Sequence, residues 1–403
     1  MVGVSIGFGL IAAAGLWLVA LVVGPKIVSR LGRVGPATFD PIAALAGRSA
    51  KVSVLIAARN EAAGIGDRID NLFSLQVPDG GLEIVIVSDG STDDTVAIAR
   101  AKAALCPADR SIVIVDLQPN GGKEVALGVA AKNAAGDILA LTDATTTWHP
   151  DVALHLVSAL AQPGVGAASG RVVYRDANGG VADAFAAYQR FVVAQRRAGR
   201  SIQVSTSGAC AAVWSGCFDR YEPTVNSDLQ LALLAAEKGM GTVYANDAVA
   251  IEDTRASLGE ELRARMRIAR RCLVSAPPLV GRLLRARAYW PLLQLALQKG
   301  TRWGIWLPAL ASVCGLALVA LSAQGLLRDG AAAGLLAVLA AATLGLLRVQ
   351  GRLAGMGRGV DALGYLVVAV VATFRAAVQI AGGQTTLGWQ PERAASAPPR
   401  SAP

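Results

Sequence analysis

Charged side chains are scarce in this 403-residue chain, at 17% of all residues, and aromatic side chains account for only 5%. The hydrophobic fraction is nevertheless 53%, so most of the apolar mass is small aliphatic residues that allow helices to pack closely. This composition is typical of an integral membrane protein. The length is sufficient for one large catalytic domain in addition to membrane segments.

Histidines and paired cysteines are also scarce, which argues against a zinc site. His149 and His155 are the only histidines, and the five cysteines show no CxxC spacing. An odd number of unpaired cysteines is typical of reduced thiols, so we expect the chain to face the cytosol.

The net charge of +9 does not indicate nucleic acid, because of where the basic residues lie. Nine arginines fall between Arg255 and Arg287, and other basic residues flank apolar runs. This placement suits anionic lipid headgroups, phosphate ligands and the positive-inside bias of membrane proteins. It predicts membrane lipids as partners and no nucleic acid.

The amino-terminal apolar run, residues 4–23, carries no charge and would span about 30 Å as a helix. It lacks the basic start and the small-residue cleavage site of a signal peptide. Lys26, Arg30 and Arg33 follow it, which predicts a cytosolic end there and an external amino terminus. We therefore expect residues 1–33 to be a transmembrane anchor.

Two further apolar runs, 304–325 and 331–347, predict two transmembrane helices within residues 304–349. Residues 277–303 mix leucines with basic and aromatic side chains, which is typical of interfacial amphipathic helices. An ordinary surface helix of the soluble domain is the alternative. The pattern favours a multi-pass protein of the inner (cytoplasmic) membrane with its catalytic domain in the cytosol.

The last apolar run, residues 362–374, has only 13 residues and is short for a membrane span. Residues 350–390 are therefore expected to form a re-entrant or interfacial segment. The stretch 391–403 is rich in Pro, Ala and Ser, which predicts a disordered tail.

Strand and helix patterns alternate in the predicted catalytic domain, residues 50–276. Strands are expected at 52–58, 82–88, 112–115 and 138–142, and helices at 62–75, 92–104 and 123–135. This alternation predicts an α/β fold with a mostly parallel sheet. No GxGxxG follows the first strand, which argues against a dinucleotide oxidoreductase.

Acidic residues follow three of these strands: Glu61, Asp89 and Asp143. The carboxyl ends of the strands are where an open α/β sheet binds its ligand. Carboxylates there can accept hydrogen bonds from the base or ribose of a nucleotide, and the ligand looks like a nucleotide-sugar. For Asp89, the alternative is a turn-forming role before Gly90.

An ordered set of motifs carries a resemblance to a known family. They are residues 57–61 (AARNE), 88–93 (SDGSTD), 120–123 (NGGK), 136–138 (GDI) and 142–144 (TDA), with Asp228 and the arginines after Glu261. From about residue 52 to 272 the chain resembles the family 2 glycosyltransferases, membrane-bound inverting enzymes that include cellulose and hyaluronan synthases. The resemblance implies a GT-A fold flanked by transmembrane helices.

The resemblance also implies a nucleotide-binding set, composed of Ala57, Arg59, Glu61, Asp89, Lys123 and Asp143. Asp143 would bind Mg²⁺ or Mn²⁺, which bridges a carboxylate to the diphosphate. The family usually has Asp-x-Asp here, whereas this chain has Asp143-Ala144-Thr145. Either Asp143 holds the metal with help from water and Thr145, or metal binding is weak. Lys123 would reach a phosphate or an acceptor hydroxyl, and a solvated lysine is the alternative.

Asp228 is the expected general base, because inverting transfer needs a carboxylate beside the acceptor hydroxyl. The family carries this base at the end of a Thr-Glu-Asp-like motif before a helix, and here Asn226-Ser227-Asp228 precedes the predicted helix 229–238. A helix cap is the alternative role. Upstream, Ser207, Gly208 and Ala209 resemble the small-residue loop that lines the family's acceptor site.

Arg263, Arg267, Arg270 and Arg271 recur at helical spacing and would share one face. Of these, Arg267, Arg270 and Arg271 are expected to bind the diphosphate and stabilise the leaving group. A membrane-facing basic helix is the alternative. The family's Gln-x-x-Arg-Trp motif is missing, and the loss of its Trp argues against processive chain extension.

The sequence thus predicts a membrane-bound inverting glycosyltransferase that uses a nucleotide-sugar, with a UDP-sugar as the expected donor. The acceptor would be a growing exopolysaccharide or a lipid-linked saccharide, with other synthesis or export subunits as further partners. The alternative is single-sugar transfer to a lipid such as a polyprenyl phosphate, ceramide or diglyceride. The missing second Asp also suggests an inactive scaffold, against which the presence of Asp89, Asp143 and Asp228 argues.

Overall fold

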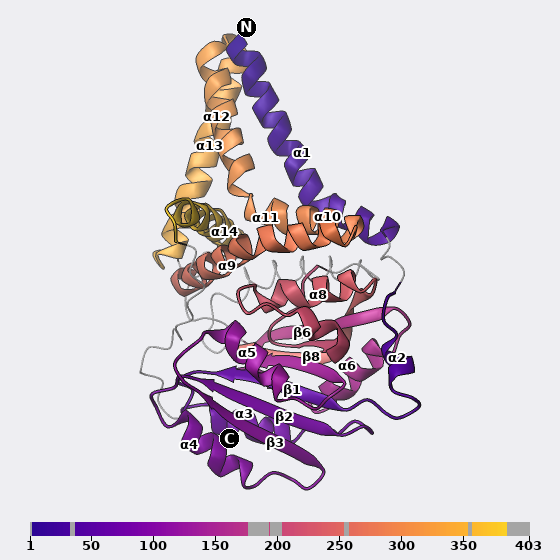
Figure 1. Ribbon diagram of the computed structural model, residues 1–403. Helices are drawn as coiled ribbons and strands as arrows, with labels where there is room; N and C mark the ends of the chain where they lie inside the picture. Colours follow the sequence, from indigo (N-terminus) through magenta and orange to yellow (C-terminus); the bar gives the residue numbers. More distant parts are fainter. Residues whose placement is uncertain are drawn as a thin grey trace.

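The computed structural model describes residues 2–32, 37–175, 193, 204–253, 258–353 and 357–384. Figure 1 shows an α/β domain, a layer of helices above it, and three helices that rise from this layer. The predicted disordered tail, residues 391–403, lies outside the described residues.

An eight-stranded sheet with the order β3-β2-β1-β4-β7-β6-β8-β5 forms the centre of the α/β domain. The strands are β1 (Val52–Ala58), β2 (Leu82–Asp89), β3 (Arg110–Leu117), β4 (Ile138–Asp143), β5 (Thr147–Trp148), β6 (Val165–Arg175), β7 (Ala211–Trp214) and β8 (Gly241–Asp253). β1 to β4 pair in parallel, whereas β7 pairs antiparallel with both β4 and β6. β6 and β8 are parallel to each other, and β5 is antiparallel to β8.

The predicted α/β fold is confirmed, and its first half is the predicted parallel sheet. Every residue of β1 and β2 is buried, as continuous apolar runs require when helices cover both faces of parallel strands. The helices around the sheet are α2 (Pro41–Ala44), α3 (Ile65–Phe73), α4 (Thr95–Ala103), α5 (Lys123–Lys132), α6 (Val152–Leu160) and α8 (Ser227–Glu237), with a 3₁₀ turn η1 (Ser215–Arg220).

Two helices start later than their patterns predicted, because polar side chains hold the preceding loops. α4 begins at Thr95 rather than at residue 92, and the Asp93 carboxylate accepts a 3.0 Å hydrogen bond from the Thr95 N–H. α3 begins at Ile65, after a loop in which Asn60 adopts φ +51°. Both loops border the carboxyl edge of the sheet.

A layer of helices lies between the α/β domain and the rising helices: α9 (Leu258–Arg285), α10 (Tyr289–Leu295), the π-helical turn η2 (Ala296–Gly300), α11 (Thr301–Trp303) and α14 (Arg358–Ala381). α9 is continuous through Pro277 and Pro278, so the predicted boundary between residues 276 and 277 falls inside one helix. Its carboxy-terminal half stays attached to the domain, since Leu279 and Leu283 are buried in a cluster with Leu229 and Leu233 of α8.

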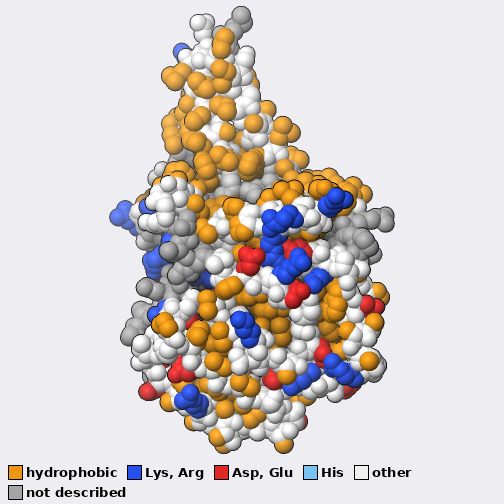
Figure 2. All heavy atoms as spheres, in the orientation of Figure 1, with side chains coloured by type: hydrophobic (Ala, Val, Ile, Leu, Met, Phe, Trp, Pro, Cys, Tyr) orange, Lys and Arg blue, Asp and Glu red, His pale blue; other side chains and the backbone are white. Residues whose placement is uncertain are grey.

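The rising helices are α1 (Val2–Leu31), α12 (Trp306–Ser322) and α13 (Gly325–Val349), whose far ends meet at the top of Figure 1. α1, α13 and residues Gly359–Ala381 of α14 are long and apolar enough to cross a membrane, and a fourth span results if the bent pair from Tyr289 to Ser322 counts as one. Hydrophobic side chains cover this region in Figure 2.

α14 is longer than its 13-residue apolar run suggested, because the helix continues into flanking polar residues for 24 residues in all. In Figure 1 it lies at the foot of α13 beside α9 and does not run along α12. The expectation that residues 350–390 form a re-entrant or interfacial segment stays a prediction.

Candidate active site

The loops that follow β1 and β2 are joined into one unit at the carboxyl edge of the sheet. The Asn60 N–H donates to Ser91 Oγ (3.1 Å), and Asn60 Oδ1 accepts from the Thr92 N–H (2.8 Å). The Glu61 N–H donates to Thr95 Oγ1 (2.8 Å), and the Glu61 side chain is only 7% exposed. The motifs 57–61 and 88–93 are thus side by side, with Ala57 buried in β1 and Arg59 half-buried beyond it. Nucleotide contact by Ala57, Arg59 and Glu61 stays a prediction.

Asp89 is fully buried and holds the loop before α5. Its carboxylate accepts hydrogen bonds from the N–H groups of Gly121 (2.7 Å) and Gly122 (2.8 Å) and from Asn120 Nδ2 (3.1 Å). Gly90 permits this contact, since it has φ +64° and a Cβ there would lie 2.8 Å from the Asn120 nitrogen. Asp89 therefore positions the start of α5, and its predicted contact with a nucleotide stays a prediction.

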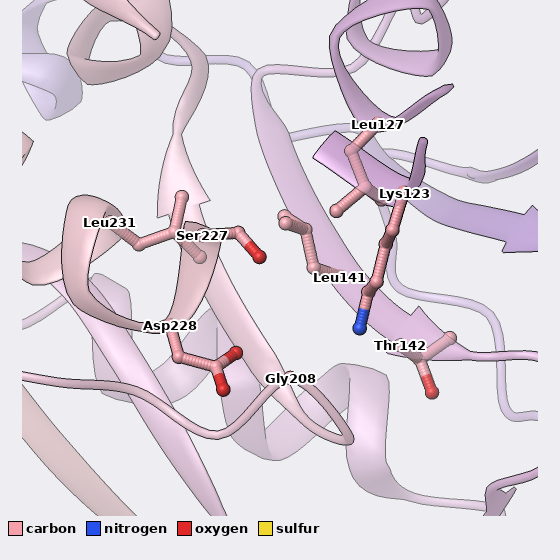
Figure 3. A pocket seen from close by; sticks show the side chains of 8 residues that line it. All are labelled: Lys123, Leu127, Leu141, Thr142, Gly208, Ser227, Asp228 and Leu231. Atoms are coloured by element: carbon pink, nitrogen blue, oxygen red, sulfur yellow. The ribbon is translucent and has the colours of Figure 1, made fainter. Parts of the chain in front are cut away.

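Lys123, Asp143, Gly208 and Asp228 come together from four separate segments. Lys123 Nζ lies 2.5 Å from Asp143 Oδ1. A Cβ on Gly208 would lie 2.7 Å from Asp228 Oδ1 and 3.4 Å from Lys123 Nζ, so both side chains approach the same small residue. The pocket in Figure 3 is lined by Lys123, Leu127, Leu141, Thr142, Gly208, Ser227, Asp228 and Leu231.

The charge of Lys123 is set by its neighbours. Burial lowers the pKa of Lys123, but the carboxylates of Asp143, Asp228 and Glu124 outweigh it and raise the pKa above its ordinary value. Lys123 is thus a cation at neutral pH.

Glu124 connects three elements behind this pocket. Its carboxylate is 4% exposed and accepts from Arg271 Nη2 (2.7 Å), Tyr221 Oη (2.8 Å) and the Ser227 N–H (3.1 Å). Burial and the adjoining Glu124 charge raise the pKa of Tyr221 well above its ordinary value. The network fixes the start of α8, the helix that carries Asp228.

The predicted diphosphate arginines have different environments. Arg271 is engaged by Glu124, Arg267 and Arg270 are half-buried, and Arg263 is exposed. The four side chains therefore do not form one uniformly exposed face. Diphosphate binding by Arg267, Arg270 and Arg271 stays a prediction.

The predicted acceptor loop packs against the predicted base. The Thr206 N–H donates to the carbonyl oxygen of Asp228 (2.7 Å), and the Ser207 N–H donates to Ser169 Oγ (3.1 Å). Gly208 faces the pocket in Figure 3, and Ala209 is buried. Contact of Ser207, Gly208 and Ala209 with an acceptor stays a prediction.

Arg68 of α3 contacts residues that hold this site in place, and it was not identified from the sequence. It is 4% exposed, its Nη2 donates to Thr142 Oγ1 (3.0 Å), and its guanidinium lies 5.5 Å from the Trp148 ring centroid. Burial lowers the pKa of Arg68 to about 9, against the opposing effect of Asp143. Thr142 Oγ1 (2.9 Å) and Trp148 Nε1 (2.8 Å) both donate to the carbonyl oxygen of Ala209. The network links the end of β4 to the acceptor loop.

A sequence signal for Arg68 exists, because it lies on the buried face of α3 with Ile65, Ile69 and Leu72. A lone arginine on the apolar face of an amphipathic helix predicts a buried, partnered cation. Glu124 gave no comparable signal, since an acidic residue in the first turn of a helix is ordinary.

The residues present can supply part of a metal site. No group of three or more His, Cys, Asp or Glu side chains that could hold a metal occurs in the described part of the chain. Asp143 offers one carboxylate whose side chain is 33% exposed, and Thr145 is exposed nearby in sequence. One carboxylate suits Mg²⁺ or Mn²⁺ when diphosphate oxygens and water complete the coordination.

Comparisons with known proteins identify the family and the fold. Residues 53–218 match the family model for glycosyl transferase family 2, and residues 138–347 match that for glycosyl transferase family group 2. The mannosyltransferase PcManGT from Pyrobaculum calidifontis, solved in complex with GDP-Man and Mn²⁺, superposes with a TM-score of 0.64 at 25% sequence identity. This alignment covers 92% of this chain and 99% of that one.

Two curated relatives match over shorter stretches. A beta-monoglucosyldiacylglycerol synthase from Nostoc sp. is 36% identical over 116 residues, covering 29% of this chain and 25% of the relative. A poly-beta-1,6-N-acetyl-D-glucosamine synthase from Staphylococcus epidermidis is 30% identical over 120 residues, covering 30% of this chain and 28% of the relative. The matches thus span about a quarter of the length of these relatives.

Proposed function

The chain belongs to glycosyltransferase family 2. We propose that it transfers a sugar from a nucleotide-sugar to a lipid acceptor with inversion at the anomeric carbon. The observation that carries the proposal is that Lys123, Gly208 and Asp228 line one pocket at the carboxyl edge of the sheet, where Lys123 also pairs with Asp143. In the proposed reaction, the donor diphosphate and the acceptor hydroxyl meet at these residues.

Asp228 acts as the general base in this mechanism. Its carboxylate takes the proton of the acceptor hydroxyl while that oxygen forms a bond to the anomeric carbon. The bond from the anomeric carbon to the diphosphate oxygen breaks at the same time, and its electron pair leaves with the nucleotide. Gly208 leaves room for the acceptor beside Asp228 Oδ1, because any side chain there would fill that space.

Lys123 binds the donor diphosphate, and Asp143 would hold the divalent metal that accompanies it. A divalent metal on Asp143 would neutralise the diphosphate and favour its departure. The Lys123 ammonium, which pairs with Asp143 here, adds a fixed positive charge beside the leaving group. Glu61 and Asp89 contribute to nucleoside recognition, and Arg267, Arg270 and Arg271 to the charge around the diphosphate.

A lipid acceptor is favoured by the architecture and by one relative. At most four candidate spans occur among the described residues, which is few for a polymer channel in a single chain. The relative from Nostoc sp. is named as a beta-monoglucosyldiacylglycerol synthase, and diacylglycerol is a lipid. We further propose that the domain faces the cytosol at the inner membrane, with Lys26 and Arg30 on its side of α1.

Polysaccharide extension is the second candidate, favoured by the similarity to the poly-N-acetylglucosamine synthase. The donor is proposed to be a UDP-sugar, and the GDP-Man complex of the structural neighbour makes GDP-mannose the other donor to test.

The deciding experiment is radiolabelled transfer from UDP-sugars and GDP-mannose in membranes that contain the protein, with Mg²⁺ or Mn²⁺. Label is separated into organic extract and high-molecular-weight polymer, and Asp228→Asn is compared with the exposed control Asp219→Asn. Label in the extract that depends on Asp228 supports a lipid acceptor. Asp228-dependent label in polymer supports extension instead, and equal signals from wild type and Asp228→Asn contradict catalysis by this pocket.

A further inference from the structure

A second cavity, of about 610 Å³, lies at the carboxy-terminal end of α8. It is lined by Arg220, Tyr221, Glu222, Glu237, Arg282, Arg285 and Ala286. Asp228 is in the first turn of α8 and Glu237 is its last residue, so the cavity lies about 14 Å along this helix from the catalytic pocket. The two sites cannot hold the same reacting group.

The glutamates of this cavity are already paired. Arg282 is 8% exposed and binds Glu237 through two hydrogen bonds, from Nε (2.6 Å) and Nη2 (2.9 Å). Its Nη1 also lies 3.2 Å from Glu222 Oε1. Burial lowers the pKa of Arg282, but the bond to Glu237 and the surrounding acids raise it overall, so Arg282 stays a cation. Neighbouring Asp219 is paired in turn with Lys238 at 2.8 Å.

Two further arginines that line the cavity are available to bind a ligand. Arg220 and Arg285 are both exposed, and within the described ranges neither guanidinium has a hydrogen-bond or ion-pair partner. A guanidinium presents donors in a planar fork that matches the oxygens of a phosphate. A concave site with two such groups at its rim and its own acids neutralised favours an anionic phosphate ester.

Apolar side chains lie directly beyond this rim. Leu284 is 49% exposed at the end of α9, and Tyr289 (62%) and Trp290 (38%) are exposed at the start of α10. Figure 2 shows Lys, Arg, Asp and Glu side chains gathered just below the hydrophobic band of these helices. Aromatic and leucine side chains beside arginines are the pattern that anchors a helix at headgroup depth.

We propose that this cavity binds the phosphate headgroup of an anionic phospholipid, with its acyl chains directed along α10. The lipid is a ligand of the membrane-docked protein and is distinct from donor and acceptor. Tyr221 lines the cavity and donates through its hydroxyl to Glu124, so the bound headgroup would contact the network behind Lys123.

Binding is tested with the full chain in zwitterionic detergent, titrated with short-chain phosphatidylglycerol, phosphatidylcholine or inorganic phosphate. The readout is the ligand-dependent rise in thermal unfolding temperature. Wild type is compared with Arg220→Gln/Arg285→Gln and with the charge-matched control Arg100→Gln/Arg287→Gln, whose exposed arginines do not line the cavity.

Phosphatidylglycerol is expected to stabilise wild type and control alike. The cavity variant should bind it about tenfold more weakly or worse, since it loses two charge-assisted contacts. Phosphatidylcholine should have little effect on any of the three. Unfolding temperatures without lipid verify that the variants fold.

Three outcomes would overturn the proposal. Equal weakening by the control pair would indicate diffuse surface charge. Unchanged phosphatidylglycerol binding in the cavity variant would exclude the cavity, and stabilisation by inorganic phosphate without any by the lipid would identify a soluble anion instead.

Discussion

At the scale of single residues, the pocket depends on positions where little or no side chain is tolerated and on a lysine whose charge is maintained by neighbouring carboxylates. Gly208 brings the acceptor loop to Asp228, and Gly90 brings the Asp89 turn to the 120–122 loop. Lys123 stays charged because carboxylates surround it. These features are local in space, and single substitutions can test them.

Replacement Gly208→Ala should reduce kcat by about 100-fold, a typical loss when a reacting group is displaced by about 1 Å. The added Cβ would lie 2.7 Å from Asp228 Oδ1, so the carboxylate must move. Steady-state kinetics in membranes measure this loss. Gly164→Ala is the surface control: its Cβ meets nothing within 4 Å, although Gly164 has φ +73° and the substitution strains the backbone there. Normal activity of Gly208→Ala would remove Gly208 from the acceptor site.

Cys210 should make the fold sensitive to alkali. Burial raises the pKa of its thiol from 9.0 to about 12. The stability that this group contributes is complete below pH 9 and is lost as the pH rises from 9 towards 12, because the unfolded thiol ionises first. Unfolding temperatures measured across this range should fall less steeply for Cys210→Ala than for wild type. Parallel curves would show that Cys210 is not the source of alkaline sensitivity.

At the scale of elements, Glu124 joins α5, α8 and α9 through one carboxylate. Arg271 on α9 is 11% exposed and Glu124 is 4% exposed, so each depends on the other for charge compensation. A buried pair of this kind is costly to break from one side only. The helix layer is therefore coupled to the start of α8, where Asp228 lies.

Replacement Glu124→Gln should lower the free energy of unfolding by about 3 kcal/mol, since it leaves the Arg271 charge buried without compensation. Thermal or denaturant unfolding of the full chain measures the loss. The double variant Glu124→Gln/Arg271→Met should recover part of it. If the double variant is less stable than the single one, the pair is not the reason for the effect.

At the scale of the whole molecule, two of the rising helices, α1 and α12, approach each other closely at glycines. A Cβ on Gly7 of α1 would lie 2.7 Å from the Gly315 carbonyl oxygen of α12, and a Cβ on Gly315 would lie 2.7 Å from that of Gly7. Small residues are what allow helices to approach closely within a bilayer. The amino-terminal helix thereby joins a hairpin formed far along the chain.

Replacement Gly7→Leu should separate α1 from α12, whereas Gly9→Leu should not, because a Cβ on Gly9 meets nothing within 4 Å. The distance between the two helices is reported by a disulfide between Gly3→Cys and Ser322→Cys, because a Cβ on Gly3 would lie 2.9 Å from the Ser322 Cβ. Cys314 is replaced by Ala in all variants. Cross-linking should be efficient with Gly9→Leu and largely lost with Gly7→Leu. Equal yields would contradict close packing at Gly7.

Topology can be tested at the same scale. Gln324 lies between α12 and α13, at the far end of the rising helices in Figure 1, and Asp94 lies in the α/β domain. A membrane-impermeant maleimide should label Gln324→Cys but not Asp94→Cys in intact cells, because the basic residues at the end of α1 favour a cytosolic domain. The reverse labelling pattern would overturn the proposed orientation.

The sequence by itself determined the parallel half of the sheet, the apolar segments and the residues that gather at the carboxyl edge. β1 covers the predicted residues 52–58, because a fully buried strand requires a continuous apolar run. Turn glycines and acidic residues after strands likewise reflect local backbone preferences, which short stretches of sequence encode.

Only the tertiary structure decided the antiparallel β7, the continuity of α9 through two prolines and the partners of the buried charges. Glu124 and Arg271 are 147 residues apart, and Lys123 and Asp143 are 20 apart. An acidic residue at a helix start has the same local pattern whether water or a buried arginine solvates it. The fold selects the partner by burying both groups together, since a buried charge must be compensated.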